Sequence, residues 1–389
     1  MSLSAKDFDG LIDRKRLIDR LQTMVRIPSE NPPGNEAEVA SLVKSYCAEL
    51  GFDTSDHEYE PGRPSVVATA GSDPPALCYC SHIDVVPAGD PSLWDADPYG
   101  GDVRDGRMHG RGSSDAKGPV AAALEAIEIL KAAGIDLAGF QFAFVADEET
   151  MGLKGAKPLV EAGLLTAPTV IVGEPTSLRI VRAQRGPCWF RLIVKGVAGH
   201  GSAPERGVNA IKHMAAILLH LEETLPDISH PVVGGPSINV GTISGGEKVN
   251  VIPASCIAEV DRRTIPGEKI EDIEAQVQVA IDRARERFPD IDARIEIPHF
   301  GTPFEVSLDA PVVTEMVRAS GEAQGSEAEI IGFRGSSDAR FFAEHGASVC
   351  VCGPGDITVA HTARESIDLD ELERGAIAYA LAFARLLER

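Results

Sequence analysis

The sequence predicts an α/β fold: a mostly parallel-sheet domain with helices on both faces, interrupted by an inserted ferredoxin-like α+β domain. Short, continuous apolar runs are typical of strands whose two faces are covered by helices. Helix-like segments alternate with these runs, which is the pattern of a parallel sheet. Near residue 183 the pattern changes to a different order of strands and helices. The predicted strands of the sheet are residues 76–81, 140–146, 169–172 and 347–352.

Predicted helices connect these strands. Residues 116–133 are rich in Ala, Leu, Ile and Glu and are followed by Gly134, as expected of a helix with a glycine stop. Asp115 stands at the entrance of this helix. Residues 308–324 and 371–387 also have helical character and flank the last strand. The chain is therefore expected to return to its first sheet after the insertion.

The insertion covers residues 183–298. Its predicted elements run in the order strand, helix, strand, strand, helix, strand, which is the order of a ferredoxin-like sandwich. They are residues 189–194, 209–225, 237–243, 254–262, 269–287 and 293–297. We therefore expect one discontinuous domain of residues 1–182 and 299–389, and one inserted domain between its two parts.

Length and composition limit the possible functions. A chain of 389 residues is too long for one ordinary core, and 43% hydrophobic with 25% charged residues is typical of a globular protein. The sequence contains no apolar run of ~20 residues and no secretory signal, so we expect a cytoplasmic protein. With 59 acidic and 37 basic residues the net charge is −22, which argues against nucleic acid or an anionic membrane as partner.

Two cysteine pairs fall inside apolar runs, Cys78 with Cys80 and Cys350 with Cys352. Alternate residues of a strand share a face, so each pair could chelate a metal. The favoured interpretation is that all seven cysteines are reduced thiols, packed as small hydrophobic groups in a cytosolic core.

Metal-capable side chains stand at the ends of the predicted parallel strands. Ligands of an open α/β sheet bind in the crevice beyond the carboxyl ends of its strands, so these side chains should converge there. In chain order they are His82 and Asp84 after the first strand, Glu148 and Glu149 after the second, Glu174 after the third, and His361 in the loop after the fourth.

A cation explains this convergence better than chance does. A lone histidine or a short acidic run is usually a solvated surface feature, but four strands with such ends, and Asp115 before a helix, form a constellation. Carboxylates crowded together repel one another unless a cation neutralises them. Two imidazoles with carboxylates suit zinc, and less typically cobalt or manganese, better than calcium or magnesium.

Eight sequence motifs, taken together, resemble the zinc aminoacylase and carboxypeptidase family, which includes acetylornithine deacetylase and succinyl-diaminopimelate desuccinylase. The resemblance extends over nearly the whole chain. In order, the motifs are SHIDVVP, GRGSSDAKG, DEET, GEPT, GHGSAP, DRRT, RGSSDARF and GPGDITVAH. The resemblance implies that the discontinuous domain is catalytic and binds metal, and that the insertion is a lid through which two chains form a homodimer.

The resemblance also implies a role for each residue of the crevice. Two zinc ions per chain are expected, with Asp115 as the bridging carboxylate, His82 and Glu174 completing one metal, and Glu149 and His361 completing the other. Asp84 is expected to accept the far imidazole N–H of His82. Glu148 is expected to take a proton from the water held between the metals and to deliver it to the leaving amine. The peptide bond between Asp115 and Ala116 is expected to be cis.

In the inserted domain, the resemblance points to residues that contact the substrate. His200 is expected to reach the reacting carbonyl and help to hold the oxyanion, either in its own subunit or in the partner of a dimer. Asn250 and Arg263 match substrate-contacting positions, and the guanidinium is expected to pair with the substrate carboxylate. Arg262 is adjacent to Arg263, and a strand alternates faces, so only one of the two can point inward.

A further turn after the insertion resembles a substrate-binding turn. Gly335, Ser336 and Ser337 form it, and Arg340 could supply a second anion partner. A plain glycine-serine turn explains the same residues nearly as well.

The leading hypothesis is hydrolysis of an N-acyl amino acid such as acetylornithine or succinyl-diaminopimelate, and an acetylornithine substrate would place the chain in arginine biosynthesis. A carboxypeptidase or dipeptidase is the nearest alternative, since it would use the same metals and the same carboxylate anchor. A non-catalytic homologue is disfavoured because Glu148 and all five ligand positions are intact. A nucleotide-binding protein is weaker still, because no strand leads into GxGxxG or GxxxxGK[ST].

Overall fold

The computed structural model describes residues 4–8, 10–71 and 74–388, and the chain divides into two compact units. The first unit extends to Arg182 and also contains Val306–Ile331 and the chain from Ser337 onward. The second contains Ala183–Glu305 and Gly332–Ser336. The assignment of a catalytic role to one part of the chain and a lid role to the other stays a prediction.

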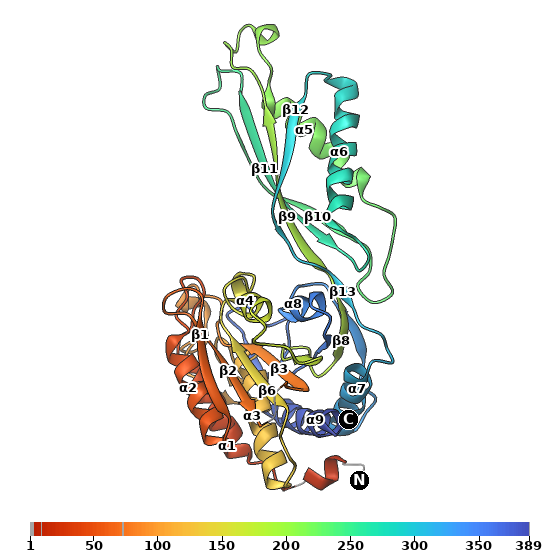
Figure 1. The fold of residues 1–389 in the computed structure, drawn as a ribbon. Coiled ribbons are helices and arrows are strands. Elements are labelled where there is room, and N and C mark those ends of the chain that lie inside the picture. Colours follow the sequence, from red (N-terminus) through yellow and green to blue (C-terminus); the bar gives the residue numbers. More distant parts are fainter. Residues whose placement is uncertain (1–3, 9, 72–73, 389) are drawn as a thin grey trace. The chain divides into compact units, whose positions relative to one another are not determined.

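The main sheet has the strand order β1-β2-β6-β3-β7-β15-β8-β13, with β14 also paired to β8. Figure 1 labels β1, β2, β3, β6, β8 and β13 of this sheet. Its centre is parallel, since β3 pairs in parallel with β6 and β7, and β15 with β7. The flanking pairs β1 with β2, β2 with β6, β15 with β8 and β8 with β13 are antiparallel. The strands are β1 (Asp53–Glu58), β2 (Pro64–Ala70), β3 (Leu77–His82), β6 (Phe140–Val145), β7 (Thr169–Val172), β8 (Ile180–Gln184), β13 (Phe304–Glu305), β14 (Ile330–Phe333) and β15 (Ser348–Val351).

Every residue of β3 and of β6 is buried, because helices cover both faces of the centre of this sheet. Helix α9 packs against both α3 and α7, and α8 contacts both β7 and β15. The α-helices of this unit are α1 (Arg14–Val25), α2 (Ala37–Glu49), α3 (Lys117–Ala132), α4 (Ala156–Glu161), α7 (Pro311–Gln324), α8 (Ala339–Glu344) and α9 (Leu369–Leu387). The predicted α/β class, with a mainly parallel central sheet, is confirmed.

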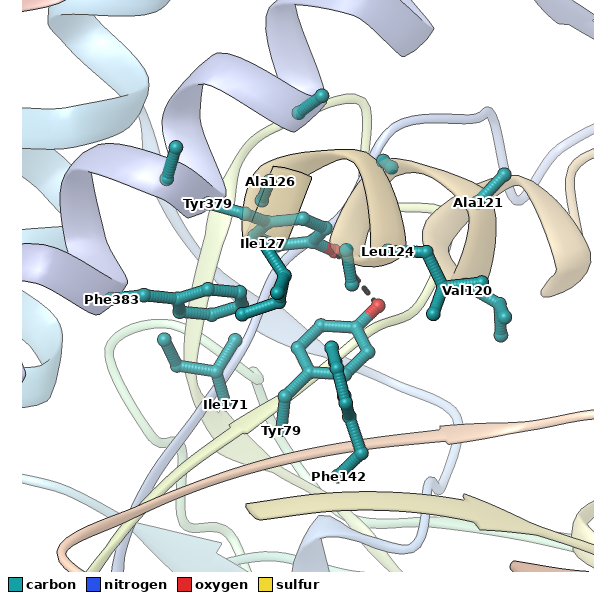
Figure 2. Close-up of a cluster of buried hydrophobic side chains, with 14 of the residues drawn as sticks. Tyr79, Val120, Ala121, Leu124, Ala126, Ile127, Phe142, Ile171, Tyr379 and Phe383 are labelled. Atoms are coloured by element: carbon teal, nitrogen blue, oxygen red, sulfur yellow. Dashed lines mark hydrogen bonds between the residues drawn. The ribbon is translucent and has the colours of Figure 1, made fainter. Parts of the chain in front are cut away.

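An aromatic cluster joins the sheet to α3 and α9 (Figure 2). The ring of Tyr79 on β3 meets Phe142 edge-on at 5.9 Å and Tyr379 at 5.1 Å between centroids. Its hydroxyl donates to the carbonyl of Pro119 at 2.8 Å, and the Tyr379 hydroxyl donates to the carbonyl of Cys352 at 2.6 Å. This packing fixes β3, β6 and α3 relative to one another, and each of them leads to residues of the predicted crevice.

The second unit is an antiparallel sheet of order β10-β11-β9-β12 with two helices on one side. This strand order is the ferredoxin-like one. Alternate residues Phe190, Leu192 and Val194 of β9 are buried with Met214 and Ile217 of α5, because strand and helix each present one apolar face. The elements are β9 (Gly186–Lys195), α5 (Ala210–Leu221), β10 (Ser237–Gly245), β11 (Ser255–Thr264), α6 (Ile270–Arg287) and β12 (Asp292–Phe300).

Smaller elements complete the described chain. A three-stranded sheet has the order β16-β5-β4. It consists of β4 (Asp102–Arg104), β5 (Arg107–His109) and β16 (Ser366–Asp368); the 3-10 helices are η1 (Ala5–Phe8), η2 (Pro91–Leu93), η3 (Glu148–Thr150), η4 (Pro204–Arg206) and η5 (Glu222–Thr224). All seven cysteines are buried and outside any disulfide, as the packed-thiol interpretation expects. Among the described helices, none combines the length and apolar character needed to cross a bilayer.

Candidate metal centre

Asp115 belongs to two groups of potential metal ligands. His82, Asp115 and Glu174 form one, and Asp115, Glu149 and His361 form the other. Within each group, one ligand atom from every residue lies within 4.8 Å of the others. The structure therefore brings together all five residues that the sequence predicts as ligands, and it places the predicted bridging carboxylate between the two groups.

The first group is deeply buried. His82 is the last residue of β3, and its Nε2 lies 3.1 Å from Oδ1 of Asp115 and 3.8 Å from Oε2 of Glu174. Glu174 follows the end of β7, which is parallel to β3, so the sheet itself fixes their separation. The sequence placed His82 just after its strand, whereas β3 includes it; the ladder to β6 continues one residue further than the apolar run.

The second group is more open. Nε2 of His361 lies 3.3 Å from Oδ2 of Asp115 and 3.0 Å from Oε2 of Glu149. The His361 side chain is 53% exposed, whereas that of Glu149 is 5% exposed. The two carboxylate oxygens of Asp115 thus face different histidines. That is the arrangement in which one carboxylate can serve two neighbouring cations.

The electrostatics of the two groups favour an additional positive charge. Burial raises the pKa of Glu174 to about 7, and hydrogen bonds to Asp115 and Glu149 raise the pKa of His361 to about 10. Burial opposes the charging of His82, yet its bonds to nearby carboxylates raise its pKa well above the ordinary value. The protein alone would therefore hold protons at sites where cations could replace them.

One carboxylate oxygen of Glu149 indicates whether a cation fits this site. Oε1 of Glu149 is buried and has no hydrogen-bond partner among the described residues, although its other oxygen faces His361. A buried carboxylate oxygen without a partner is costly unless something else neutralises it. Two imidazoles and three carboxylates are a donor set that suits zinc. The residues present therefore fit a pair of divalent cations.

Asp84 connects the two groups. Nδ1 of His82 is 2.9 Å from the main-chain carbonyl of Asp84 and 3.5 Å from its carboxylate Oδ1, so the nearer acceptor on Asp84 is the carbonyl. The carboxylate instead accepts the N–H of Glu148 at 3.3 Å and that of Glu149 at 3.2 Å. Asp84 therefore orients the imidazole through its main chain and the acidic turn through its side chain.

Glu148 belongs to neither ligand group. It begins η3 directly after Asp147, whose φ of 68° forms the sharp turn after β6. Burial, followed by repulsion from Glu174, raises the pKa of Glu148 well above its ordinary value. A carboxylate with a raised pKa beside the ligands, but not among them, is suited to accept and return a proton.

The backbone around Asp115 is held by a residue that sequence reasoning missed. Oε1 of Glu365 accepts the N–H groups of Ser114 and Asp115, each at 3.1 Å, and its other oxygen pairs with Arg111. The peptide bond between Asp115 and Ala116 is cis, as the family resemblance implied. Glu365 lies in no recognisable motif, so its contact with Asp115 emerges only from the fold.

His200, Asn250 and Arg263, for which the sequence predicts contacts with the substrate, lie in the second unit. His200 is exposed; its Nδ1 lies 2.7 Å from the Ser202 hydroxyl, and an isolated bridge pairs it with Val251, next to Asn250. Arg262 is fully buried and bonds to Glu268, so Arg263 faces the other side of β11, where it pairs with Asp261 at 2.9 Å.

The predicted turn of Gly335 and Ser336 also lies in the second unit, with the Ser336 hydroxyl accepting from Gln184 at 3.3 Å. Ser337 is buried and begins the next segment of the first unit. The role of Arg340 as a second anion partner stays a prediction. It is 3% exposed, and its Nη2 donates to the carbonyl of Met151 at 2.5 Å, so the guanidinium supports the turn that follows Glu149.

The sequence is similar to a known protein family and to named enzymes of other organisms. The chain matches the model of Peptidase family M20/M25/M40 over residues 78–385. The acetylornithine deacetylase of Myxococcus xanthus is 36% identical over 331 residues, which cover 82% of each chain, and that of Photorhabdus laumondii is 32% identical over 343 residues, or 85% of each chain. The chain belongs to peptidase family M20/M25/M40.

Solved structures agree with the M20 assignment at the level of the fold. A tripeptidase from Staphylococcus aureus aligns with a TM-score of 0.79 and 24% sequence identity, covering 98% of this chain and 100% of that one. As a member of the M20 family the chain is a hydrolase, and the resemblance drawn from its motifs is confirmed. Relatives named as deacetylases and neighbours named as peptidases leave its substrate open.

Proposed function

We propose that the chain is a two-metal deacylase that hydrolyses the amide bond of an N-acyl amino acid, with acetylornithine as the first candidate substrate. The observation that carries the two-metal chemistry is Asp115, whose two oxygens face His82 and His361 in separate ligand groups. The choice of deacylase over peptidase is supported by the relatives named as acetylornithine deacetylases, at 36% and 32% identity.

The residues of the site divide the reaction between them. Two divalent cations, zinc by the family resemblance, would polarise the scissile carbonyl and lower the pKa of the attacking water. Glu148 takes a proton from that water while the water oxygen forms a bond to the carbonyl carbon. It then delivers the proton to the amine nitrogen as the carbon–nitrogen bond breaks. The turn held by Asp84 keeps Glu148 and Glu149 in fixed relation to each other.

The second unit is proposed to recognise the substrate. Arg263 pairs with the free carboxylate of the amino acid, with Asn250, Gly335 and Ser336 as further contacts. His200 is proposed to donate to the oxyanion when this unit closes over substrate, in its own subunit or in the partner of a homodimer. A His200→Ala variant that hydrolyses its substrate at the wild-type rate would remove His200 from the reaction. The enzyme is proposed to act in the cytoplasm.

Turnover on a matched set of substrates tests the proposed function. The purified, zinc-loaded protein is assayed on acetyl-, succinyl- and formyl-amino acids, including acetylornithine and succinyl-diaminopimelate, and on dipeptides and tripeptides. We expect the highest kcat/KM on an N-acyl amino acid, by about tenfold or more over the best peptide, which corresponds to about 1.4 kcal/mol of preferential transition-state binding. A dipeptide or tripeptide as the best substrate would replace the deacylase with a peptidase on the same metal site.

The substrate carboxylate is expected to be obligatory. Methylating it while leaving the acyl amide intact should lower kcat/KM by roughly thirtyfold, or about 2 kcal/mol, which is the low end for loss of a charge partner. The low end applies because Arg263 is 27% exposed and already pairs with Asp261. Arg263→Ala should produce a similar loss and then barely distinguish the acid from its ester. Equal rates for acid and ester in the wild type would show that Arg263 is not the anchor.

A further inference from the structure

The turn that carries Glu148 and Glu149 is closed by Asp147. Oδ1 of Asp147 accepts from the Thr150 hydroxyl at 2.7 Å, and Oδ2 accepts from the N–H of Lys154 at 3.0 Å. Its main-chain carbonyl accepts from the N–H of Gly152 at 2.7 Å. The same residue therefore ties the start of the turn to three positions beyond Glu149. Any movement of Asp147 would move the turn.

Asp147 is held in turn by a buried arginine. Nη1 of Arg63 lies 2.8 Å from Oδ1 of Asp147, while its Nε lies 3.0 and 3.1 Å from the two oxygens of Glu36. Arg63 is 4% exposed, Asp147 2% and Glu36 0%. We call these three residues the Arg63 clamp. Gly34 packs directly on the guanidinium, since a Cβ there would lie 2.3 Å from Nε, and this fixes where Arg63 sits.

A chain of hydrogen-bonded side chains leads from the clamp to Asp84. The Thr150 hydroxyl, bonded to Asp147, accepts from Nδ2 of Asn31 at 2.9 Å. The same Nδ2 donates to Oδ2 of Asp84 at 2.8 Å. Asp84 also accepts the N–H of Glu148 and of Glu149. The acidic turn is thus held between two buried aspartates, and Arg63 fixes one of them.

Stability alone is a weak reason for such a clamp. Burying an arginine with two carboxylates costs desolvation free energy that their attraction only partly offsets, and hydrophobic replacements of buried ion pairs are often at least as stable. A planar, bidentate guanidinium does, however, hold the carboxylates that it binds in a fixed orientation. The hydrogen bonds that begin at Arg63 end at the turn of Glu148 and Glu149.

We propose that Arg63 is a positioning residue of the active site: through Asp147 it holds the turn that directs Glu148 at the substrate and Glu149 at its cation. The proposal rests on the proposed function for the role of Glu148. Its effect on Glu149 is independent of that role, because cation binding can be measured without turnover.

Arg63→Lys tests the proposal while keeping the positive charge. Lysine cannot bond Glu36 and Asp147 through a planar fork, so the turn should become less well fixed. We expect kcat to fall by about 10–100-fold with KM changed less than about twofold, the range found when supporting partners of metal ligands are lost. In calorimetric titration of the metal-free protein with zinc, one of the two sites should weaken by about tenfold or more, and the other should keep its affinity.

Arg20→Lys is the matched control, because Arg20 lies in the same unit, is 7% exposed and pairs with Glu128 at 2.7 Å without contact to the site. It should lower the melting temperature without changing kcat or either zinc affinity. If Arg63→Lys behaves like this control, Arg63 is only structural and the proposal is wrong. A weakened zinc site in Arg63→Lys would still support the proposal if the assignment of Glu148 as base failed.

Asp147→Asn provides a second route that leaves Arg63 paired with Glu36, in case the first variant folds poorly. If Arg63 acts through Asp147, Asp147→Asn should show the same selective loss of one zinc affinity and a similar fall in kcat. The double variant should then be little worse than either single one, because both changes break the same connection. Fully additive effects would overturn the path through Asp147.

Discussion

Glu148→Gln is expected to lower kcat by about 10²–10⁴-fold while leaving the metal content and the fold unchanged. The amide has the shape of the carboxylate but cannot take a proton from water or return it to the amine, and that is the size of contribution that a positioned general base makes. Glu148 lies outside both ligand groups, so its charge is not needed to hold a cation. Stopped assays on the best acyl-amino acid, with elemental analysis of the same samples, measure both quantities.

Glu149→Gln is the matched control, because it changes the neighbouring residue of the same turn in the same way. Oε2 of Glu149 faces His361, so this variant should lose affinity for one cation, and its activity should recover in part when zinc is added in excess. Glu148→Gln should not recover. If Glu148→Gln retained turnover and lost metal, the base and the ligand would have to be exchanged.

The candidate metal centre could be predicted from the sequence because most of its residues follow regular strands. His82, Glu148 and Glu174 stand at or directly after the ends of β3, β6 and β7, which are parallel neighbours, so the topology alone brings them to one edge of the sheet. Asp115 and His361 lie in loops; His361 was expected there because its loop follows the fourth predicted strand, and Asp115 because it stands before a helix. All five ligand candidates do meet.

The supporting residues could not be predicted, because they reach the site across long stretches of chain. Arg63 bonds Asp147 at a separation of 84 residues, and Glu365 bonds the N–H of Asp115 at a separation of 250. Neither residue lies in a motif, and a buried arginine looks the same in sequence as an exposed one. Asp338 shows a related failure. It stands inside RGSSDARF and is buried, and burial raises its pKa to about 7, yet the sequence analysis passed over it for its neighbours.

The central parallel strands of the main sheet were predicted because they are apolar throughout, and the edge strand β1 was missed because it is not. β3 and β6 are buried along their whole length, so they read as continuous apolar runs. β1, with the sequence DTSDHE, has no buried residue and forms one edge of the main sheet. Such a strand is held by its ladder to β2 rather than by side-chain burial, so its sequence carries no hydrophobic period that could reveal it.

Asp115→Asn is expected to remove both cations, whereas changes to the other ligands should remove one. Oδ1 of Asp115 faces His82 and Oδ2 faces His361, so the loss of its charge weakens both groups at once. Elemental analysis after zinc reconstitution should give about two metals per chain for the wild type, about one for His361→Ala, and well under one for Asp115→Asn at the same free zinc. Turnover of Asp115→Asn should fall to the limit of detection.

Asp338→Asn is the control for this comparison, because Asp338 is a buried carboxylate of the same unit that belongs to neither ligand group. It should keep two metals per chain. That result would show that Asp115→Asn loses metal because a ligand is lost, and not because a buried negative charge near the site is removed. If Asp115→Asn retained one tightly bound metal, Asp115 would serve a single site. The second group of Glu149 and His361 would then be an ion pair on the rim of a one-metal centre, held by the 3.0 Å contact that joins them.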